Sequence, residues 1–477
     1  MVFSSPAFIF LFLPAFFLVY AALPARFRSS WIMTGSWIFY GFWRADFLLL
    51  LAGVTVGNWL AGLALARASE APRAERNRRL VVGAAVVGNL ALLGYFKYFN
   101  FGMDSLNAVL GLFGVRGLET WSVVLPVGIS FYIFQSMSYV IDVYRGDAPP
   151  AHDFVDLAAY VSLFPQLVAG PILRYKDLAG QLRQRVHSET RAAFGLKRFI
   201  VGLGRKVLIA DALGPVANAA FSMADPGAAE AWLGLFAYAV QLYFDFSGYS
   251  DMAVGLGHMM GFTFMENFDA PYRSSSITDF WRRWHISLSS WLRDYLYLPL
   301  GGNRRGPART YLNLFLVMVL GGLWHGAAWT FVLWGCWHGA LLAFERLAGA
   351  KRRGAVLHGF VGVVLTQLAV LAGWVLFRAQ DLASAGRMFA ALGGANGWAR
   401  PGGLGWLAGG LELAVLALGV ALIVVEPRAR ERQAEAERAE NGTRAPVLPR
   451  LAWLAVGVLA VVRLAADSYS PFLYFQF

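Results

Sequence analysis

Long apolar segments, separated by short polar ones, recur along the whole chain. A helix needs about 20 residues to cross the hydrocarbon core of a bilayer, and most of these segments are long enough. The segments predicted to span a membrane are residues 3–23, 31–66 (enough for two short passes), 80–99, 121–141, 193–221, 232–264, 310–344, 357–377, 404–425 and 451–466. The pattern predicts an all-α polytopic membrane protein, with residues 1–477 forming a single integral membrane domain of about 9 to 12 transmembrane helices.

Composition agrees with this pattern. Of the 477 residues, 58% are hydrophobic and only 15% are charged, whereas soluble domains carry about 25% charged residues. The first apolar segment has no basic residue before it and is followed by Arg26 and Arg28. A secretory signal peptide has the opposite charge order, so we expect an uncleaved first helix with a periplasmic N-terminus.

Basic residues gather in a few polar stretches, which predicts the orientation of the helices. Residues 67–79 hold five Arg against two Glu, residues 174–206 hold nine basic residues against two acids, and residues 266–309 hold seven Arg against four acids. A further basic patch is formed by residues 351–353. The positive-inside rule places all of these stretches in the cytoplasm. The net charge of +12 then indicates contact with anionic lipid or an anionic ligand, and it requires no nucleic acid.

A polar stretch at residues 426–450 interrupts the last apolar segments. It holds six Arg and five Glu, with Asn441-Gly442 and Pro446 as helix breakers. We expect a charged cytoplasmic linker, helical in part, before a final helix that leads to a periplasmic C-terminus.

Residues 164–172, FPQLVAGPI, carry two prolines and a glycine inside an apolar helix candidate. Such a sequence fits a re-entrant or broken helix, whose backbone must be buried in protein or line a cavity. A simple proline kink explains the local sequence equally well.

The segment 310–344 contains no Asp, Glu, Lys or Arg in 35 residues, yet it holds His325 and His338. One straight helix of this length would measure about 52 Å, well beyond a hydrocarbon core of about 30 Å. We therefore expect a bend or division near Gly321-Gly322 or Gly326, and His325 at depth. A buried neutral imidazole can accept a proton from a hydroxyl group. The alternative is a histidine hydrogen-bonded to a neighbouring helix without a catalytic role.

Residues 279–294, DFWRRWHISLSSWLRD, combine Arg and Trp around His285. On one helix, Trp281, Trp284 and Trp291 would share a face, as in a helix that lies in the membrane interface. Alternatively, the guanidinium groups would guide an anionic thioester donor, because their forked geometry suits phosphate. The candidates for either role are Arg282, Arg283, Trp284 and Arg293.

Residues 241–251, QLYFDFSGYSD, place Asp245 and Asp251 among apolar residues. We expect their partners among the arginines of residues 273–293, in a structural ion pair that ties this segment to the bundle. Direct chemistry is the weaker reading, because a carboxylate paired to Arg is a poor base near neutrality.

Several other kinds of site have no sequence signature here. No His or Cys cluster has the spacing of metal ligands, so we expect no bound metal. No GxSxG elbow or phosphate-binding glycine loop accompanies the histidines. Cys336 is the only cysteine, which excludes a disulfide within the chain.

Four quoted stretches carry a family resemblance. QLYFDFSGYSDMAVGLGHMMGF, NFDAPYRSSSITDFWRRWHISLSSWLRDYLYLPLGGNR, GLWHGAAWTFVLWGCWHG and the terminal SPFLYFQF resemble the membrane-bound O-acyltransferase superfamily, in particular its branch of alginate O-acetyltransferase membrane subunits. The resemblance covers nearly the whole chain, and FPQLVAGPI shares it. It implies a helical bundle with re-entrant and interfacial helices around a central tunnel. It also implies that His325 is the catalytic histidine of the family and that His285 occupies the second signature position.

The resemblance further implies a membrane O-acetyltransferase of the bacterial inner membrane. The donor would be a cytoplasmic thioester, acetyl-CoA or an acyl-carrier protein, with no bound cofactor. The acetyl group would reach an exported polysaccharide through a periplasmic partner of the serine-hydrolase-like type and through the polysaccharide export machinery. Relatives that transfer D-alanyl groups or acetylate peptidoglycan share much of the pattern, so the acceptor stays open.

Two readings from other classes remain beside the enzyme. Buried acids and histidines could serve as proton relays in a transporter or export channel. Against this stands the absence of a repeat between the two halves of the chain. A scaffold that only recruits a periplasmic acetylase is the third reading.

Overall fold

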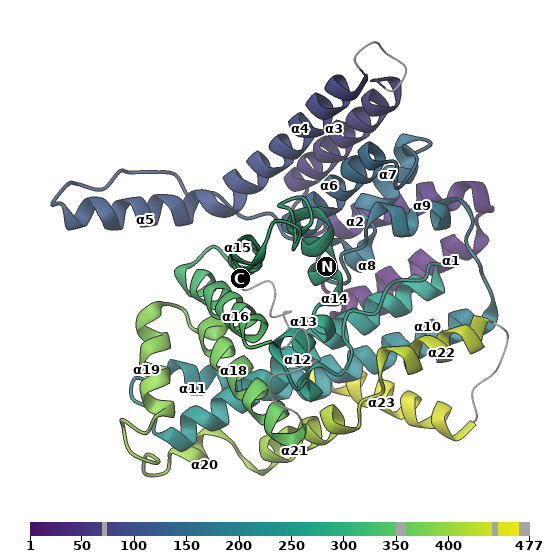
Figure 1. Ribbon diagram of the computed structural model, residues 1–477. Coiled ribbons are helices and arrows are strands. Elements are labelled where there is room, and N and C mark those ends of the chain that lie inside the picture. Colours follow the sequence, from purple (N-terminus) through teal and green to yellow (C-terminus); the bar gives the residue numbers. More distant parts are fainter. Residues whose placement is uncertain (69–73, 350–358, 441–446, 467–477) are drawn as a thin grey trace. The chain divides into compact units, whose positions relative to one another are not determined.

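The computed structural model describes residues 1–68, 74–349, 359–440 and 447–466, and these form helices and turns with no strand (Figure 1). The protein is an all-α polytopic membrane protein, as the apolar pattern predicts. Its chain divides into two compact units, Met1–Val186 (unit 1) and His187–Phe477 (unit 2). The basic patch 351–353, the breakers Asn441-Gly442 and Pro446, and the terminal SPFLYFQF lie outside the described residues.

Unit 1 contains the predicted segments up to residue 186, and most of them are interrupted. Its helices are, in chain order, the π-helix Ala7–Phe12, α1 (Leu13–Ala22), α2 (Arg28–Gly41), α3 (Asp46–Ala68), α4 (Ala74–Leu93), the π-helix Gly94–Tyr98, α5 (Phe99–Leu112), α6 (Ile129–Arg145), α7 (Phe154–Val161), α8 (Phe164–Leu167) and α9 (Tyr175–Arg183). The segment 31–66 divides into α2 and α3, as its length predicts.

Aromatic side chains fill the centre of unit 1. Phe164 lies 5.0 Å from Phe16 and 5.6 Å from Phe39 between ring centroids. These contacts join α1 and α2 to α8 through rings that are almost completely buried. The apolar N-terminal segment is therefore an integral part of the packed unit.

The proline-containing segment at residues 164–172 is a broken helix. The chain leaves α7 at Val161, makes the single turn α8, and continues without regular structure through buried residues to α9. The side chain of Tyr160 donates to the backbone oxygen of Leu173 over 2.8 Å, and the Gln166 amide donates to the backbone oxygen of Tyr160 over 3.0 Å. Irregular backbone that is buried needs such partners. The arrangement favours the broken helix over a simple kink.

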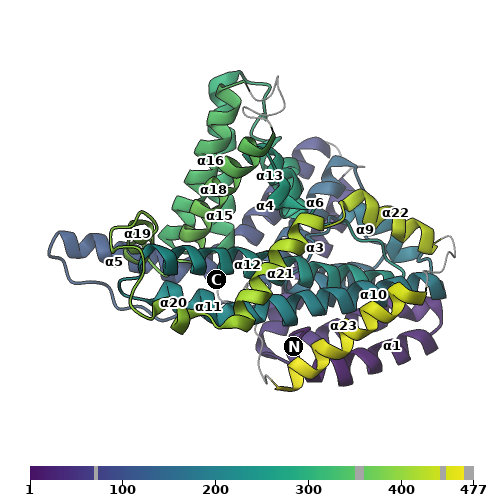
Figure 2. The same cartoon turned by 90° about the horizontal axis from the view of Figure 1, so that it is seen from below.

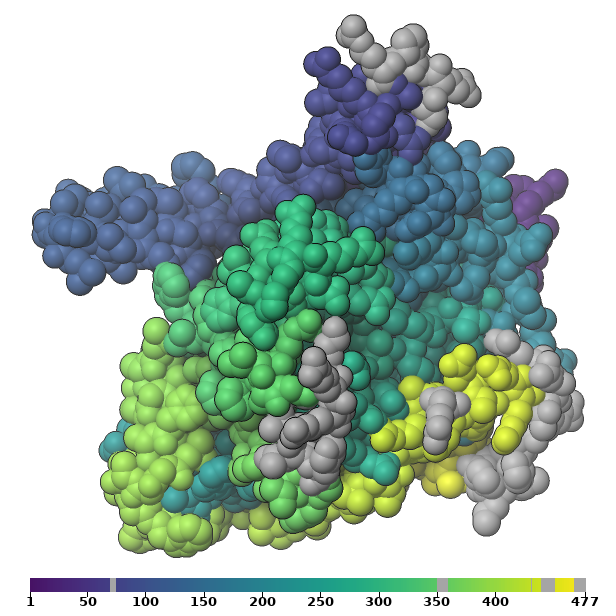
Figure 3. Space-filling model, viewed as in Figure 1, coloured from purple at the N-terminus to yellow at the C-terminus, as the bar shows by residue number. Residues whose placement is uncertain are grey.

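Helix α5 projects as an arm from the rest of unit 1 (Figure 3), and none of its residues is buried. The chain then returns along the same helix. Asn100 pairs through its side-chain amide with the backbone of Val123, and Asn107 pairs in the same way with Leu118. The helix predicted at residues 121–141 consequently begins only at Ile129.

Unit 2 contains the longest helix and most of the residues expected to act in chemistry. Its helices are α10 (Glu189–Gly204), the π-helix Arg205–Ala210, α11 (Asp211–Ser222), α12 (Ala228–Met259), α13 (Ile277–Arg283), α14 (Ile286–Leu292), the π-helix Arg293–Tyr297, α15 (Pro307–His325), α16 (Trp329–Leu347), α18 (Gly359–Arg378), α19 (Leu382–Leu392), α20 (Gly403–Leu407), α21 (Gly410–Val425), α22 (Ala429–Glu440) and α23 (Val447–Ala466). Helix α22 confirms that the stretch 426–450 is helical in part.

Glycines let two helix pairs in unit 2 approach closely. Where α10 crosses α12, a Cβ added at Gly195 would lie 2.5 Å from the backbone oxygen of Gly255. In the hairpin of α15 and α16, a Cβ at Gly335 would lie 2.5 Å from the backbone oxygen of Met318. Small residues at helix crossings are typical of membrane proteins, because packing and not the hydrophobic effect holds such helices together.

The uncharged segment 310–344 divides at one of the predicted places. Helix α15 ends at His325, the chain turns through Gly326, and α16 returns beside α15 (Figure 2). Helix α18 packs against α16, so α15, α16 and α18 stand side by side in both ribbon views. His325 consequently lies at the end of a helix in a hairpin. A single bent span over the same residues would have placed it near the midpoint.

By length and composition, three of the described helices are apolar enough to cross a membrane. They are Asp46–Ala68, the continuous stretch Ala74–Leu112, and Gly359–Arg378. Shorter apolar helices are Ala7–Ala22, Leu382–Leu392, Gly410–Val425 and Leu451–Ala466.

Candidate active site

His285 lies at a sharp break between two short helices. Helix α13 ends at Arg283 and α14 begins at Ile286, and the backbone of His285 is left-handed with φ of 45°. A non-glycine residue in this region is strained, and such strain is frequent at functional sites. The expectation of one continuous amphipathic helix over residues 279–294 is wrong, because this break turns the chain at the histidine.

A loop that precedes α13 holds His285 in place. The Asn267 side-chain oxygen lies 3.2 Å from Nδ1 of His285, and it accepts from the backbone nitrogen of Ser287 over 3.1 Å and from the Ser287 hydroxyl over 2.9 Å. The backbone oxygen of Asn267 also accepts from Ile286 over 2.9 Å. One asparagine thus binds three consecutive residues around the break.

His325 is the last residue of α15. A Cβ at the next residue, Gly326, would overlap the ring of Phe331, so only glycine fits at the turn into α16. The negative end of a helix macrodipole stabilises a positive charge by about 0.3–2 kcal/mol. His325 therefore lies at the negative end of the α15 dipole.

The two histidines predicted from the sequence are neighbours within unit 2. Their ring centroids are 6.1 Å apart, although 40 residues separate them in the chain. The exposed fraction is 0% for His285 and 4% for His325. The two imidazoles therefore belong to one buried cluster.

Aromatic rings enclose the pair. Phe246 lies 4.7 Å from His285, edge to face, while Trp334 and Phe377 each lie 5.2 Å from His325. Trp324 contacts both histidines, at 6.0 Å and 5.1 Å. These rings exclude water, which strengthens electrostatic interactions inside the site. Burial lowers the pKa of His285 to about 3, so its imidazole is neutral at physiological pH.

The tryptophans of residues 279–294 do not form the single aromatic face expected from the sequence. Trp284 is buried and packs 4.9 Å from Trp374 and 5.2 Å from Phe268, so it belongs to the core and not to a lipid-facing surface. Its partner in the expected aromatic face, Trp291, is buried as well. Since Trp281 and Trp284 lie before the break and Trp291 after it, they do not share one helical face.

The three arginines also differ from one another. Arg283 binds Asp279 over 2.9 Å and lies 3.6 Å from Asp269, so its guanidinium already has two carboxylate neighbours. Arg293 pairs with its neighbour Asp294 over 2.7 Å. Arg282 is exposed and makes no ion pair with any described residue, so it remains available to an anionic ligand.

Asp245 and Asp251 each form ion pairs, but the expectation that their partners lie in residues 273–293 is wrong. Asp245 binds Lys206 over 2.8 Å, and Asp251 binds both Arg198 and Arg205, the latter over 2.7 Å. None of these partners lies in residues 273–293. Helix α10 and the π-helix after it pack closely against α12, because glycines at the crossing let the backbones approach. This brings their basic side chains to the acids of α12.

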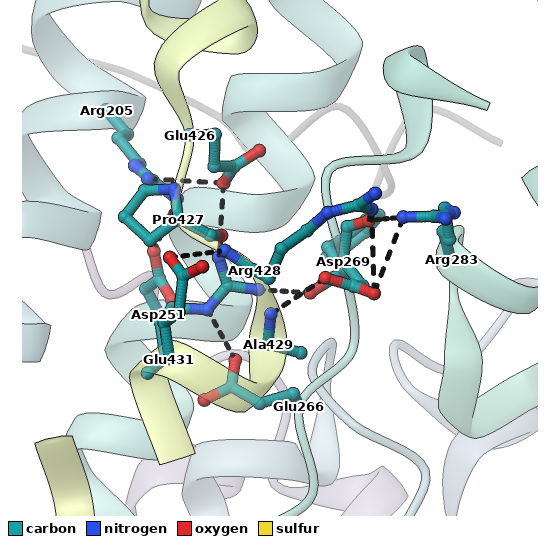
Figure 4. A network of polar contacts seen from close by, with 12 residues as sticks. Arg205, Asp251, Glu266, Asp269, Arg283, Glu426, Pro427, Arg428, Ala429 and Glu431 are labelled. Atoms are coloured by element: carbon teal, nitrogen blue, oxygen red, sulfur yellow. Dashed lines mark hydrogen bonds and ion pairs between the residues drawn. The ribbon is translucent and has the colours of Figure 1, made fainter. Parts of the chain in front are cut away.

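Asp251 belongs to a larger network that joins distant parts of unit 2 (Figure 4). Arg432 on α22 lies 3.2 Å from Glu266 and 3.5 Å from Glu426, and Arg205 lies 3.3 Å from Glu426. Arg198 binds Glu266 over 2.8 Å as well as Asp251. The network thereby fastens the charged stretch 426–440 to the core. Buried charges require such pairing.

Sequence reasoning missed Asn267 and the rings of Phe246, Trp334 and Phe377. An asparagine in NFDAPYR carries no charge and interrupts no apolar span, so hydropathy and charge give no signal for it. The rings are ordinary apolar residues until the fold brings them to the histidines. His338 accepts from the indole nitrogen of Trp281 over 3.3 Å and is separated from His325 by Trp334.

A group of possible metal ligands occurs in unit 1 among the described residues. His152, Asp153 and Asp156 have ligand atoms within 4.8 Å of one another, and two of them are exposed. Exposed acidic groups are common without a metal ion. These residues belong to unit 1, whereas the paired histidines belong to unit 2.

Comparison with known proteins gives a consistent result. A model of the membrane-bound O-acyltransferase family matches residues 148–358. The chain is 48% identical to a probable alginate O-acetylase of Azotobacter vinelandii and to another of Pseudomonas putida, with both chains covered completely in each case. A peptidoglycan O-acetyltransferase of Helicobacter pylori is 36% identical over 83% of this chain and 80% of its own length. Both histidines lie within the matched residues 148–358.

Proposed function

Because the chain belongs to the membrane-bound O-acyltransferase family and is an O-acyltransferase, we propose that it transfers acetyl groups from a cytoplasmic thioester to an exported polysaccharide. Acetyl-CoA is the proposed donor, and an acyl-carrier thioester is the alternative. Alginate is the proposed polymer, because full-length similarity at 48% identity connects the chain to probable alginate O-acetylases. Peptidoglycan is the second candidate, supported by the lower similarity to the Helicobacter pylori enzyme.

The observation that carries the mechanism is the pairing of His285 and His325, 6.1 Å apart in a buried aromatic enclosure. In the proposed reaction, His325 takes the proton of an acceptor hydroxyl as its oxygen attacks the thioester carbonyl. The carbon–sulfur bond breaks, the ester bond forms, and the thiolate leaves and receives the proton. Alternatively, His325 carries the acetyl group transiently. General-base assistance of this kind contributes about 10²–10⁴ in rate.

His285 is the proposed second site residue. It would orient the donor or hydrogen-bond the reacting groups from the opposite side of the enclosure. An oxyanion-binding role would require its inward nitrogen to carry a hydrogen, which depends on its tautomer. Arg282 is the proposed contact for the phosphates of the donor, because it is exposed and makes no ion pair with any described residue.

We further propose that the chain works as one integral membrane domain in the bacterial inner membrane, with both termini periplasmic. The basic stretches support this orientation through the positive-inside rule. A periplasmic acetyltransferase of the serine-hydrolase-like type would pass the acetyl group to the polymer, together with the export machinery.

The test of the site is the substitution His325→Ala. We expect it to abolish polymer acetylation in cells while leaving protein level and detergent melting nearly unchanged, since an alanine at a helix end removes the base without unpairing a buried charge. The exposed His152→Ala is the matched control, and it should retain acetylation. If His325→Ala retains acetylation, His325 is not essential and the proposal is wrong.

CoA release from acetyl-CoA by the purified chain distinguishes an acyl-transfer site from a proton-coupled transport site. An enzyme of the proposed kind releases CoA, and His325→Ala abolishes that release. A transporter or a scaffold would release none in either form.

A further inference from the structure

We propose that Asn267 is a positioning residue that fixes the tautomer of His285, so that Nε2 is available to a substrate as a hydrogen-bond acceptor. This inference rests on the proposed function, because it assigns Asn267 a role in the same site. Neither the sequence motifs nor the family similarity gives this asparagine a role. The role follows from the hydrogen-bond donors that surround the side-chain oxygen of Asn267.

The orientation of the Asn267 amide is determined by a backbone group. The backbone nitrogen of Ser287 can only donate, and it lies 3.1 Å from the side-chain atom assigned as oxygen. With the amide turned by 180°, an NH₂ group would face that N–H, and two donors would oppose each other. The atom facing Ser287 is therefore the oxygen.

The same oxygen lies 3.2 Å from Nδ1 of His285. An amide oxygen only accepts, so the favourable arrangement puts the hydrogen on Nδ1. A deprotonated Nδ1 would set its lone pair against those of the oxygen. The Ser287 hydroxyl could favour the other tautomer only by donating to Nδ1. It lies 3.4 Å from Nδ1 but 2.9 Å from the Asn267 oxygen, so it donates to the oxygen.

A neutral imidazole with a hydrogen on Nδ1 has a lone pair on Nε2. In this structure Nε2 of His285 is buried and has no hydrogen-bond partner among the described residues. Buried polar atoms without a partner are rare and call for an explanation. An acceptor held ready for a hydrogen bond from a substrate hydroxyl, or from His325, explains it. A donor to an oxyanion does not, because that role needs the other tautomer.

The backbone holds this arrangement rigid. The backbone nitrogen of Ile286 donates to Asn267 over 2.9 Å, and that of Asp269 donates to Arg283 over 2.9 Å. These two bonds run on either side of His285 and maintain its left-handed backbone, with φ of 45°. The imidazole is thus positioned before any substrate arrives, which is what a group that orients a substrate needs.

The direct test is the nitrogen spectrum of the full chain labelled with [¹⁵N]histidine in lipid vesicles. Protonated and unprotonated imidazole nitrogens are well separated in this spectrum, and the difference from His285→Gln identifies the two signals of His285. We expect Nδ1 to be protonated and Nε2 to be unprotonated in the wild type, and the preference to be lost in Asn267→Leu. A hydrogen on Nε2 of wild-type His285 would overturn the inference, whether or not the chain releases CoA.

Rates of CoA release from acetyl-CoA separate positioning from a merely structural role. Asn267→Leu should lower kcat at least tenfold and change KM less than twofold at a temperature where the variant remains folded. Its melting temperature should fall somewhat, because the buried backbone N–H of Ser287 loses its acceptor. Asn267→Asp keeps an acceptor at the same place but adds a negative charge that favours the imidazolium. We therefore expect it to melt like the wild type and to show an acid limb in its pH profile that the wild type lacks.

Ser290→Ala on α14 is the control. Its hydroxyl bonds only to the backbone oxygens of Ile286 and Ser287, and both the rate and the pH profile should stay unchanged. Wild-type kcat and pH profile in both Asn267 variants would contradict the positioning role. If His285→Gln itself retains full activity, the proposed function of His285 fails instead, and the nitrogen spectrum still decides the tautomer.

Discussion

His285 is neutral because it is completely buried, and its pKa of about 3 lies below the ordinary value of about 6.5. Between these two values the unfolded chain binds a proton that the folded chain excludes. The stabilisation from keeping His285 neutral is therefore complete above about pH 6.5 and is lost as the pH falls toward 3.

This linkage predicts that acid destabilises the protein in part through His285. Between pH 6.5 and pH 5, this residue should account for about 2 kcal/mol of lost stability. His285→Gln removes the contribution, so its melting temperature in detergent should fall less between pH 7 and pH 5 than that of the wild type. The exposed His152→Gln should behave like the wild type, and an equal fall in both variants would contradict the burial argument.

The two histidines could be predicted from the sequence, but their neighbour Asn267 could not. An ionisable residue in an apolar segment is conspicuous because it is costly to bury. A neutral amide costs less and occurs in many loops, so its role depends on which atoms it meets. That information exists only once the loop at residue 267 lies against the break at residue 285.

Helix α15 carries His325 at its end, so its packing against α16 sets the position of the site. The contact depends on Gly335, where a Cβ would lie 2.5 Å from the backbone oxygen of Met318 and 2.7 Å from Cα of Val319. Backbone atoms cannot rotate away as a flexible side chain can. The two helices would have to separate.

Gly335→Val should therefore destabilise the hairpin by about 1–3 kcal/mol and reduce polymer acetylation strongly, because it displaces His325. Melting in detergent and acetylation in cells measure the two effects. Gly386→Val is the control, since a Cβ at Gly386 on α19 meets no atom within 4 Å. Normal acetylation in Gly335→Val would show that the site tolerates a shift of α15.

The ion network around Asp251 joins α10, α12 and α22 through buried charges. Removal of Asp251 leaves Arg198 and Arg205 without a shared partner. Breaking a buried pair in this way costs about 3–5 kcal/mol.

Asp251→Ala should accordingly lower protein level and melting temperature, and lose acetylation only as a consequence. The exposed pair Arg116–Glu119 offers a control, because Glu119→Ala at the surface should cost less than about 1 kcal/mol. A stable Asp251→Ala without activity would instead indicate that the carboxylate takes part in the reaction.

Across the whole molecule, the apolar pattern predicts helices and the basic stretches predict orientation. The structure describes two compact units, and the paired histidines, their aromatic enclosure and the ion network all belong to unit 2. From the positive-inside rule we propose that residues 266–309 face the cytoplasm and that the short loop between α11 and α12 faces the periplasm.

Cysteine labelling tests this orientation. In a Cys336→Ser background, which removes the only natural cysteine, Ala224→Cys should react with a membrane-impermeant maleimide in intact cells with an opened outer membrane. Arg304→Cys should react only after the inner membrane is opened. Both positions are exposed in the structure, so the opposite result would invert the proposed topology.

The sequence alone determined the helical membrane class and the division of residues 310–344. It also predicted the orientation of the basic stretches and the choice of His285 and His325 as candidate site residues. These features follow from local properties, namely hydropathy, charge and the cost of an ionisable group in an apolar segment. Tertiary structure decided the partners of Asp245 and Asp251, the break of residues 279–294 at His285, and the 6.1 Å approach of His285 to His325. The physical reason is that partners and distances across a bundle depend on which helices cross and how closely, and in this protein glycine contacts between backbones govern both.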